Sequence, residues 1–421
     1  ATPTAATPTA APRAAAPAAR LDADNPWPGL LSFTEDNRAF FHGRTQDVAA
    51  LMRLIRRDTL TVLFGRSGYG KTSLLQAGLF PALRAEDFLP IKIRLDFAPD
   101  APPLADQVAR RLRATFAEEG IDAPPPDTAS LWAYFHDART EFWSRRHHLL
   151  TPVLVFDQFE EILTLGATAR RDEADALLTQ IADLAESRPP AEVRAAIERG
   201  ERDAAEWRLS DSPVKLVLSF REDYLAQFEA LRGRMPSIMT GRMRVLPMTV
   251  QQGLEAVLAS GGHLVDASVA REIVAFVAGR GADHVAADGA TQPGEAEIEP
   301  ALLSVVCHEL NRRRRAVGLA RISHALLDVA HDAIIADFYR QSVAATPDAL
   351  RRLIEDELVT LDGHRKSFPL ADALGRPGVR EADIAALVGH RILRVDDRFG
   401  SRHLELTHDL LTGVVRAARA E

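Results

Sequence analysis

The chain has 421 residues and a formal net charge of −8, from 51 basic and 59 acidic side chains. This length corresponds to about two to four domains, and the 46% share of hydrophobic residues excludes global disorder. The excess of acidic residues disfavours a protein built mainly to coat nucleic acid. A single cysteine excludes an internal disulfide framework and any multi-cysteine metal site, and no run approaches the roughly 18 apolar residues of a membrane span.

The sequence opens on a segment of low complexity. Its first twenty residues hold ten Ala, four Thr, four Pro and two Arg, which leaves no hydrophobic face to bury. We therefore expect residues 1–24 to be a flexible tether that joins the rest of the chain to something upstream. Because no signal peptide is present, we also expect a cytoplasmic protein with no membrane partner.

Four short apolar runs in the next part of the chain are typical of buried strands. Helical patterns separate them, for example the apolar positions between Leu177 and Leu184. Strands that alternate with helices predict an α/β fold with a mostly parallel sheet covered on both faces. We assign this domain to residues 25–247. The four runs are Thr59–Phe64, Pro90–Leu95, Pro152–Phe156 and Val214–Phe220.

After about Val245 the pattern changes, because segments with helical periodicity dominate. We expect a helical domain over residues 248–345. Near the C-terminus, two short strand-like runs at 391–395 and 403–406 flank a polar turn and predict a hairpin with helices on either side. Helices with one hairpin in about eighty residues fit a winged-helix domain, which we place at 346–421.

A phosphate-binding motif follows the first predicted strand. Residues 65–72 match G-x-x-x-x-G-K-[ST] in full, and the residues from Ser73 onward can form a helix. In such a loop, backbone N–H groups converge on a phosphate, the lysine ammonium binds the β- and γ-phosphates, and the threonine hydroxyl can bind Mg²⁺. The residues expected to bind the nucleotide here are Gly65, Ser67, Gly68, Tyr69, Gly70, Lys71, Thr72 and Ser73.

Two further strand ends carry candidate catalytic residues. Asp157 ends the third apolar run and is expected to hold Mg²⁺, while Glu160 or Glu161 is expected to polarise the attacking water. Arg221 ends the fourth run, where ligands bind in open α/β sheets, and is a candidate for binding the γ-phosphate. Its spacing is equally compatible with an ion pair to a neighbouring acid.

Taken together, these motifs resemble the bacterial novel STAND NTPases, which are related to the NACHT and NB-ARC signalling switches. The resemblance covers nearly the whole chain from Asn25 onward, and the motifs occur in the order of the family. It implies ATP or ADP and Mg²⁺ as cofactors. The segments that carry it are Asn25–Phe33, Phe40–Arg44, Gly65–Thr72, Asp157–Glu161, Glu299–Leu310 and Leu404–Asp409.

The resemblance also implies roles for individual residues. The segment with Phe41, Gly43 and Arg44 would wrap the adenine side of the nucleotide, Pro300 would pack against the base, and His408 would touch the β-phosphate of ADP. Pro300 is also compatible with a simple helix start, and His408 with a surface position in a first helical turn. Thr407 stands where the family has Met, and the glycine that usually precedes the proline is lacking.

The resemblance implies a signalling switch in which ADP holds a closed form and ATP favours a form that oligomerises with itself. Slow hydrolysis would reset the switch, and a role in antiviral defence is expected. An upstream effector, a downstream sensor and a trigger ligand would be partners. The alternatives are a winged-helix DNA-binding ATPase regulator and a constitutive ATPase motor. The helix before the predicted hairpin carries Glu381 and Asp383, so we expect no nucleic acid partner.

Overall fold

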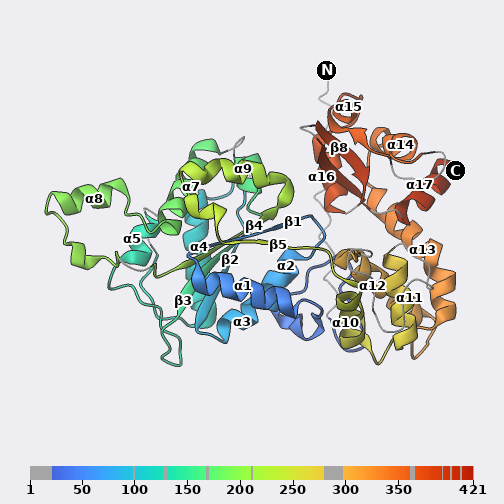
Figure 1. The fold of residues 1–421 in the computed structure, drawn as a ribbon, viewed down its shortest axis with the longest axis horizontal. Coiled ribbons are helices and arrows are strands. Elements are labelled where there is room, and N and C mark those ends of the chain that lie inside the picture. Colours follow the sequence, from blue (N-terminus) through green and yellow to red (C-terminus); the bar gives the residue numbers. More distant parts are fainter. Residues whose placement is uncertain are drawn as a thin grey trace, which may run out of the picture.

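A computed structural model describes residues 21–97, 100–126, 130–166, 170–209, 212–278, 297–360, 366–390, 392–398, 401–407 and 410–420. Residues 1–20 of the predicted tether at 1–24 lie outside these residues, and so does His408. Among the described helices, none combines the length and apolar character needed to cross a bilayer. The described chain forms a sheet-containing part and a mainly helical part, which lie side by side in Figure 1.

The sheet-containing part is built on five parallel strands in the order β2-β3-β4-β1-β5. Four of these strands match the predicted runs to within two residues, and the predicted α/β fold is confirmed. The fifth strand, β5, has three residues and was not predicted. The strands are β1 (Leu60–Gly65), β2 (Phe88–Ile93), β3 (Thr151–Asp157), β4 (Lys215–Arg221) and β5 (Arg242–Arg244).

Helices cover both faces of this sheet because its central strands are apolar on both sides. Val153 and Val155 of β3 face the helices on one side, and the alternating Leu154 and Phe156 face those on the other. On the first face lie α1 (Thr45–Arg57) and a continuous helical segment formed by α2 (Lys71–Ser73), η2 (Leu74–Leu79) and α3 (Phe80–Arg84). On the second face lie α4 (Leu104–Glu119), α5 (Leu131–His136), α7 (Arg171–Ala185) and α9 (Leu225–Glu229).

Several short elements connect these layers. Helix α8 (Ala191–Glu198) extends away from the sheet and buries no residue. The remaining elements of this part are short helical turns. They are η1 (Glu35–Phe40), η3 (Ile162–Gly166), η4 (Ala204–Glu206), η5 (Glu222–Tyr224), η6 (Ala230–Gly233) and η7 (Pro236–Met239).

The second part begins with helices and ends with a small antiparallel sheet of order β6-β8-β7. The predicted hairpin is present, with Val395 opposite Leu404. The assignment of this region as a winged helix and the domain boundaries remain predictions. The elements are α10 (Val250–Gly261), α11 (Ala267–Val277), α12 (Pro300–Ala316), α13 (His324–Val343), α14 (Asp348–Glu357), β6 (Phe368–Pro369), α15 (Leu370–Leu374), α16 (Glu381–Gly389), β7 (Leu393–Arg398), β8 (Ser401–Leu406) and α17 (Leu410–Ala420).

One continuous hydrophobic core runs through this second part. It includes Val257 of α10, Val306 of α12, Tyr339 of α13 and Val415 of α17, all fully or almost fully buried. The indole of Trp27, from the start of the described chain, is part of the same core. The N-terminal segment therefore packs with the helices that follow the sheet, although it precedes the sheet in sequence.

Candidate functional site

The predicted phosphate loop connects β1 to the helical segment that starts at Lys71. Gly68 and Gly70 have φ angles of 95° and 85°, which side chains with a Cβ rarely adopt. A Cβ on Gly70 would meet no atom within 4 Å, so the backbone conformation, and not a lack of space, requires glycine there. The loop can therefore turn its N–H groups toward a ligand at the helix start.

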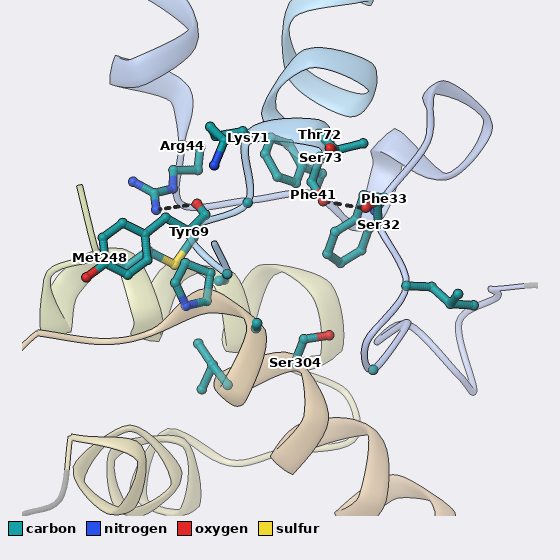
Figure 2. A pocket seen from close by; sticks show the side chains of 18 of the residues that line it. Ser32, Phe33, Phe41, Arg44, Tyr69, Lys71, Thr72, Ser73, Met248 and Ser304 are labelled. Atoms are coloured by element: carbon teal, nitrogen blue, oxygen red, sulfur yellow. Dashed lines mark hydrogen bonds between the residues drawn. The ribbon is translucent and has the colours of Figure 1, made fainter. Parts of the chain in front are cut away.

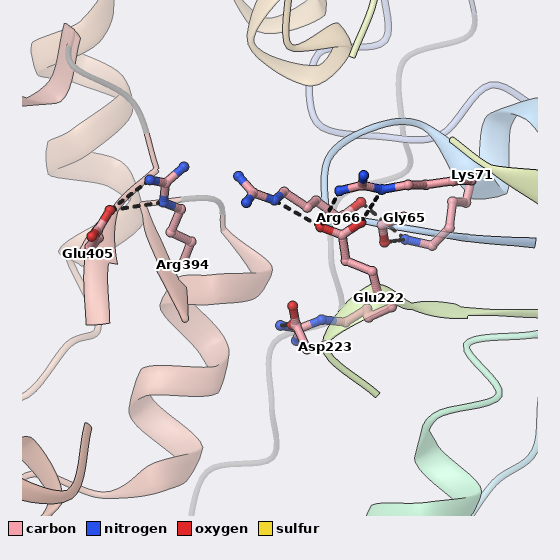
Figure 3. A network of polar contacts seen from close by, with 9 residues as sticks. Gly65, Arg66, Lys71, Glu222, Asp223, Arg394 and Glu405 are labelled. Atoms are coloured by element: carbon pink, nitrogen blue, oxygen red, sulfur yellow. Dashed lines mark hydrogen bonds and ion pairs between the residues drawn. The ribbon is translucent and has the colours of Figure 1, made fainter. Parts of the chain in front are cut away.

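The Lys71 side chain lies along the inside of this loop. Its ammonium group donates hydrogen bonds to the carbonyl oxygens of Gly65 and Arg66, at 2.7 and 3.1 Å (Figure 3). Burial lowers the pKa of Lys71 to about 8, and the negative charge of Glu160 opposes part of that effect. The cation is thus held at the loop, and a bound phosphate would supply the charge that stabilises its protonated form.

The two predicted magnesium ligands are in contact. The Thr72 hydroxyl lies 3.1 and 3.3 Å from the two carboxylate oxygens of Asp157, which is buried at the end of β3. Within the described chain, no three His, Cys, Asp or Glu side chains form a metal-binding group. A hydroxyl beside one carboxylate fits Mg²⁺, because this ion usually takes few protein ligands and shares the phosphate oxygens of its nucleotide.

Sequence reasoning missed a third group at this position. Lys92 of β2 places its ammonium 3.6 Å from Oδ2 of Asp157. The sequence contained a weak signal, because Lys92 is one of four lysines in the chain. Its proximity to Asp157 could be recognised only from the order of the strands, which places β2 beside β3.

The structure distinguishes between the two candidate glutamates. Glu160 is buried, lines the cavity described below, and accepts a hydrogen bond from the Arg221 backbone at 3.3 Å. Desolvation raises its pKa, as is common for carboxylates that act in proton transfer. Glu161 is not one of the cavity-lining residues, and it pairs with Arg94 at 3.3 Å. Only Glu160 is therefore brought to the candidate site.

Arg221 lies at the cavity and also forms the ion pair that its spacing allowed, while its binding of the γ-phosphate stays a prediction. The residue lines the cavity, and its guanidinium pairs with Asp223 and lies 6.0 Å from the ring centre of Tyr224. The adjacent Glu222 links the phosphate loop to β5, because its carboxylate binds Arg66 and Arg244, each at 2.9 Å (Figure 3). These contacts connect the loop to the neighbouring strand.

A cavity of about 270 Å³ lies between the phosphate loop and the helical part. Its phosphate end contains the charged and polar groups described above, and the other end is largely apolar (Figure 2). The cavity is lined by eight of the residues that were predicted to bind the base or the phosphates, not counting the glycines of the loop. These are Phe41, Arg44, Ser67, Tyr69, Lys71, Thr72, Ser73 and Pro300, joined by Gly68 and Gly70 of the loop.

Two predicted residues are close to the cavity without lining it. A Cβ on Gly43 would lie 2.4 Å from the Gln252 carbonyl oxygen, and one on Gly65 would lie 2.7 Å from that of Val245. Both glycines therefore allow close backbone packing. Gly65 also supplies a carbonyl oxygen to Lys71. The remaining predicted residue, His408, lies outside the described residues.

Arg44 holds the wall of the cavity together. Its side chain is only 4% exposed and its guanidinium binds Asp47 at 2.8 Å. The same group donates to the carbonyl oxygen of Tyr69 at 3.2 Å (Figure 2) and to that of Leu246 at 2.9 Å. Arg44 therefore has a structural role, because it connects the phosphate loop to the chain entering α10, and its role at the adenine stays a prediction.

The N-terminal segment forms a wall that the sequence did not predict. Trp27, Gly29, Leu31, Ser32 and Phe33 all line the cavity. The Phe33 backbone donates a hydrogen bond to the Ser73 hydroxyl at 3.1 Å, and its ring centre lies 5.6 Å from that of Phe41. The opposite end of this wall is anchored on the helical part, where Asp24 pairs with the buried Arg314.

One serine at the apolar end of the cavity has an unsatisfied hydroxyl. Ser304 lies one helical turn after Pro300 in α12, and its buried Oγ atom has no hydrogen-bond partner among the described residues. By contrast, the hydroxyl of the cavity-lining Ser260 lies 2.7 Å from the Ala256 carbonyl oxygen and 2.8 Å from that of Phe40. A buried hydroxyl without a partner is costly, so this position fits a ligand with a hydrogen-bonding edge.

The model of the family Novel STAND NTPase 1 matches residues 26–414. No curated protein matches the sequence.

Solved structures with similar folds were also found. Cdc6p from Pyrobaculum aerophilum is 15% identical, with 90% of this chain and 94% of that chain covered and a TM-score of 0.39. The ORC2 protein of Aeropyrum pernix with ADPNP and ADP is 13% identical, with coverages of 91% and 98% and a TM-score of 0.44. The Walker-type ATPase of Pyrococcus abyssi is 15% identical, with coverages of 91% and 98% and a TM-score of 0.45.

Proposed function

The chain belongs to the Novel STAND NTPase 1 family and is a nucleotide-binding protein, and we propose that it is an ATP/ADP-operated signalling switch. In this proposal ADP stabilises a closed arrangement of the two parts of the chain. ATP favours an open arrangement, and slow hydrolysis returns the protein to the closed one. A ligand shifts such an equilibrium only by its different affinities for the two forms.

The composition of the cavity is the observation that carries this proposal. One wall is the phosphate loop, another is the N-terminal segment that includes Phe33, and a third is formed by α10 and α12 of the helical part. Gly389, at the end of α16, also lines the cavity. A nucleotide bound there would contact elements from both parts of the chain, so its binding energy would depend on how the parts are arranged.

The residues present suit the two ends of a nucleotide. Lys71 and the N–H groups of the loop would bind the phosphates, and Thr72 with Asp157 would hold Mg²⁺, which neutralises phosphate charge when bound. The rings of Phe33 and Phe41 and the Pro300 side chain offer apolar surface for a base, and the Ser304 hydroxyl offers it a hydrogen bond. This division supports an adenine nucleotide as the ligand.

Glu160 is the proposed general base of a slow ATPase activity. Its raised pKa, its burial and its place on the cavity wall support this role, and the pairing of Glu161 with Arg94 argues against the second glutamate. A low steady-state rate is expected of a switch. High turnover without any trigger would instead support a constitutive motor.

The ATP-bound form is proposed to oligomerise and to activate a linked effector in bacterial defence, as the resemblance of the sequence implies. The described structure offers little support for DNA binding through the C-terminal part. Arg380, just before α16, donates two hydrogen bonds of 2.7 Å to Asp383, so its charge is neutralised. We therefore expect no salt-dependent binding to duplex DNA.

The nucleotide content of the purified protein tests this function. Denaturation and chromatography of the released small molecules should identify ADP, and the stripped protein should bind ADP again. Light scattering with ADP and with a non-hydrolysable ATP analogue should then give different masses. A protein that carries no adenine nucleotide and does not bind one would contradict the proposal, and equal masses would contradict the oligomerisation step.

A further inference from the structure

Gln158, directly after Asp157, has an unusual backbone. Its φ angle is 58°, in the left-handed region that residues with a side chain rarely adopt. Gly is favoured there, and Asn or Asp can compensate through their short polar side chains, but Gln has no such advantage. A strained residue of this kind persists only where its surroundings fix it, and such positions are concentrated at functional sites.

The contacts of the neighbouring residues fix this turn. The Phe159 backbone N–H donates to the Ser219 carbonyl oxygen in β4 at 2.8 Å, and the Glu161 N–H donates to the Gln158 carbonyl oxygen at 3.1 Å. The buried Phe159 ring packs against Phe156 and Phe228, with centres 5.3 and 5.6 Å away. The backbone of Gln158 is therefore held in place by residues on both sides of it.

Gln158 lies at the candidate site, and its side chain has an unsatisfied polar atom. Gln158 lines the same cavity as Lys71, Glu160 and Arg221. Its amide oxygen is buried and has no hydrogen-bond partner among the described residues. A buried acceptor without a donor costs free energy, so both the backbone and the side chain of this residue are held in unfavourable states.

We propose that Gln158 is a further catalytic residue, which binds the attacking water together with Glu160. This inference rests on the proposed function, because it assumes ATP in the cavity. The Gln158 amide oxygen accepts one O–H of the water, and the Glu160 carboxylate accepts the other. In this proposal the strained backbone conformation of Gln158 is retained because it places an amide at the end of β3, immediately beside Asp157.

The step is a hydrolysis that needs no further reactant. The water oxygen forms a bond to the γ-phosphorus while the bond between that phosphorus and the β–γ bridging oxygen breaks. The electron pair of the broken bond stays on ADP, and the proton of the water passes to Glu160. Gln158 gains and loses no proton, and it acts by orienting the water for in-line attack.

Replacement of Gln158 by glycine distinguishes the effect of the amide side chain from the effect of the strained backbone. Gln158→Gly removes the amide and relieves the left-handed strain, so the protein should melt at the parent temperature or above it. ADP affinity should stay within about twofold, and single-turnover hydrolysis of ATP should fall at least about tenfold. Gln158→Asn tolerates the same backbone but shortens the amide, and it should show an intermediate rate.

Ser187→Gly is the matched control. Ser187 also has a left-handed backbone, with a φ of 47°, but it does not line the cavity. Its replacement should match the effect of Gln158→Gly on melting and leave hydrolysis unchanged. A defect in hydrolysis shared by both glycine variants would assign the effect to the backbone and overturn the proposal.

The remaining outcomes are also decisive. A Gln158→Gly protein that hydrolyses ATP at the parent rate would overturn the role of the amide, and so would a parent that binds ATP without hydrolysing it. If Gln158→Gly fails to fold, the Gln158→Asn variant takes its place, and ATP hydrolysis by that variant at the rate of the parent protein would overturn the role of the amide. A parent that binds no nucleotide contradicts the proposed function instead, so the two failures can be told apart.

Discussion

The ammonium group of Lys92 lies 3.6 Å from Oδ2 of Asp157, the same oxygen to which the Thr72 hydroxyl donates at 3.1 Å. Two residues further along the chain, Arg94 pairs with Glu161. Lys92 of β2 and Arg94, directly after that strand, thus pair with two acids, Asp157 at the end of β3 and Glu161 beyond it. Only the first of these pairs involves a proposed magnesium ligand.

Lys92→Met should therefore increase the affinity of the ADP complex for Mg²⁺. The Lys92 ammonium and the metal ion would share one carboxylate, and removal of the competing charge should favour the ion by about 1 kcal/mol, or roughly fivefold. Calorimetric titration of Mg²⁺ into the ADP complex measures this. Arg94→Met removes an equal charge two residues away and should change the affinity much less, so equal effects would contradict the specific role of Lys92.

Ser304→Ala should weaken ADP binding by about two- to tenfold, because the hydroxyl is available for a hydrogen bond worth about 0.5–1.5 kcal/mol. Ser260→Ala is the control, since that hydroxyl lines the same cavity but is already hydrogen-bonded to backbone carbonyl groups. Affinity for pyrophosphate, which has no base or ribose, should be the same in both variants. Unchanged ADP binding in the Ser304 variant would place the ligand elsewhere in the cavity.

Glu160→Gln should lower single-turnover hydrolysis of ATP by about 100-fold or more while ATP binding persists, since it removes the proposed base. Glu161→Gln should have a small effect, because Glu161 pairs with Arg94 outside the cavity lining. Hydrolysis can be followed by the release of labelled phosphate from a preformed complex. The assignment of the base to Glu160 fails if the larger loss is seen in the Glu161 variant.

Nucleotide binding should weaken as the pH rises above about 8. Burial lowers the pKa of Lys71 to about 8, so the free protein loses this charge above that pH, whereas bound phosphate stabilises the ammonium and raises its pKa. Between the two pKa values, ADP affinity should fall by up to about tenfold per pH unit. In Lys71→Arg the guanidinium stays charged, so the affinity should lose this pH dependence even if it is lower throughout.

Local sequence patterns were sufficient for four of the five strands of the large sheet and for the phosphate loop. Four strands are continuous apolar runs, and the loop has a fixed spacing of glycines, Lys71 and Thr72. Strand β5 was missed because three residues, two of them arginine, carry no such pattern. It forms because it pairs with β1 along the chain that leaves η7.

The rest of the site depends on contacts between distant segments. The wall at Trp27 and Phe33 and the unpaired hydroxyl of Ser304 depend on how the two parts pack. The ion pair of Lys92 depends on the order of the strands, and no local pattern encodes either arrangement. Spacing could not separate Glu160 from Glu161 either, because adjacent residues differ here only in the direction of their side chains. Arg94, directly after the neighbouring strand β2, pairs with Glu161 and so distinguishes the two glutamates.

The continuous core from α10 to α17 has a mechanical consequence. Because α13 packs against both α12 and α17 inside one buried cluster, bending between the helices and the small sheet would expose apolar surface that now excludes water. We therefore expect the second part to move as a rigid body, with a hinge where the chain passes from β5 into α10. Arg44 binds the Leu246 carbonyl oxygen at this hinge and would restrict its movement.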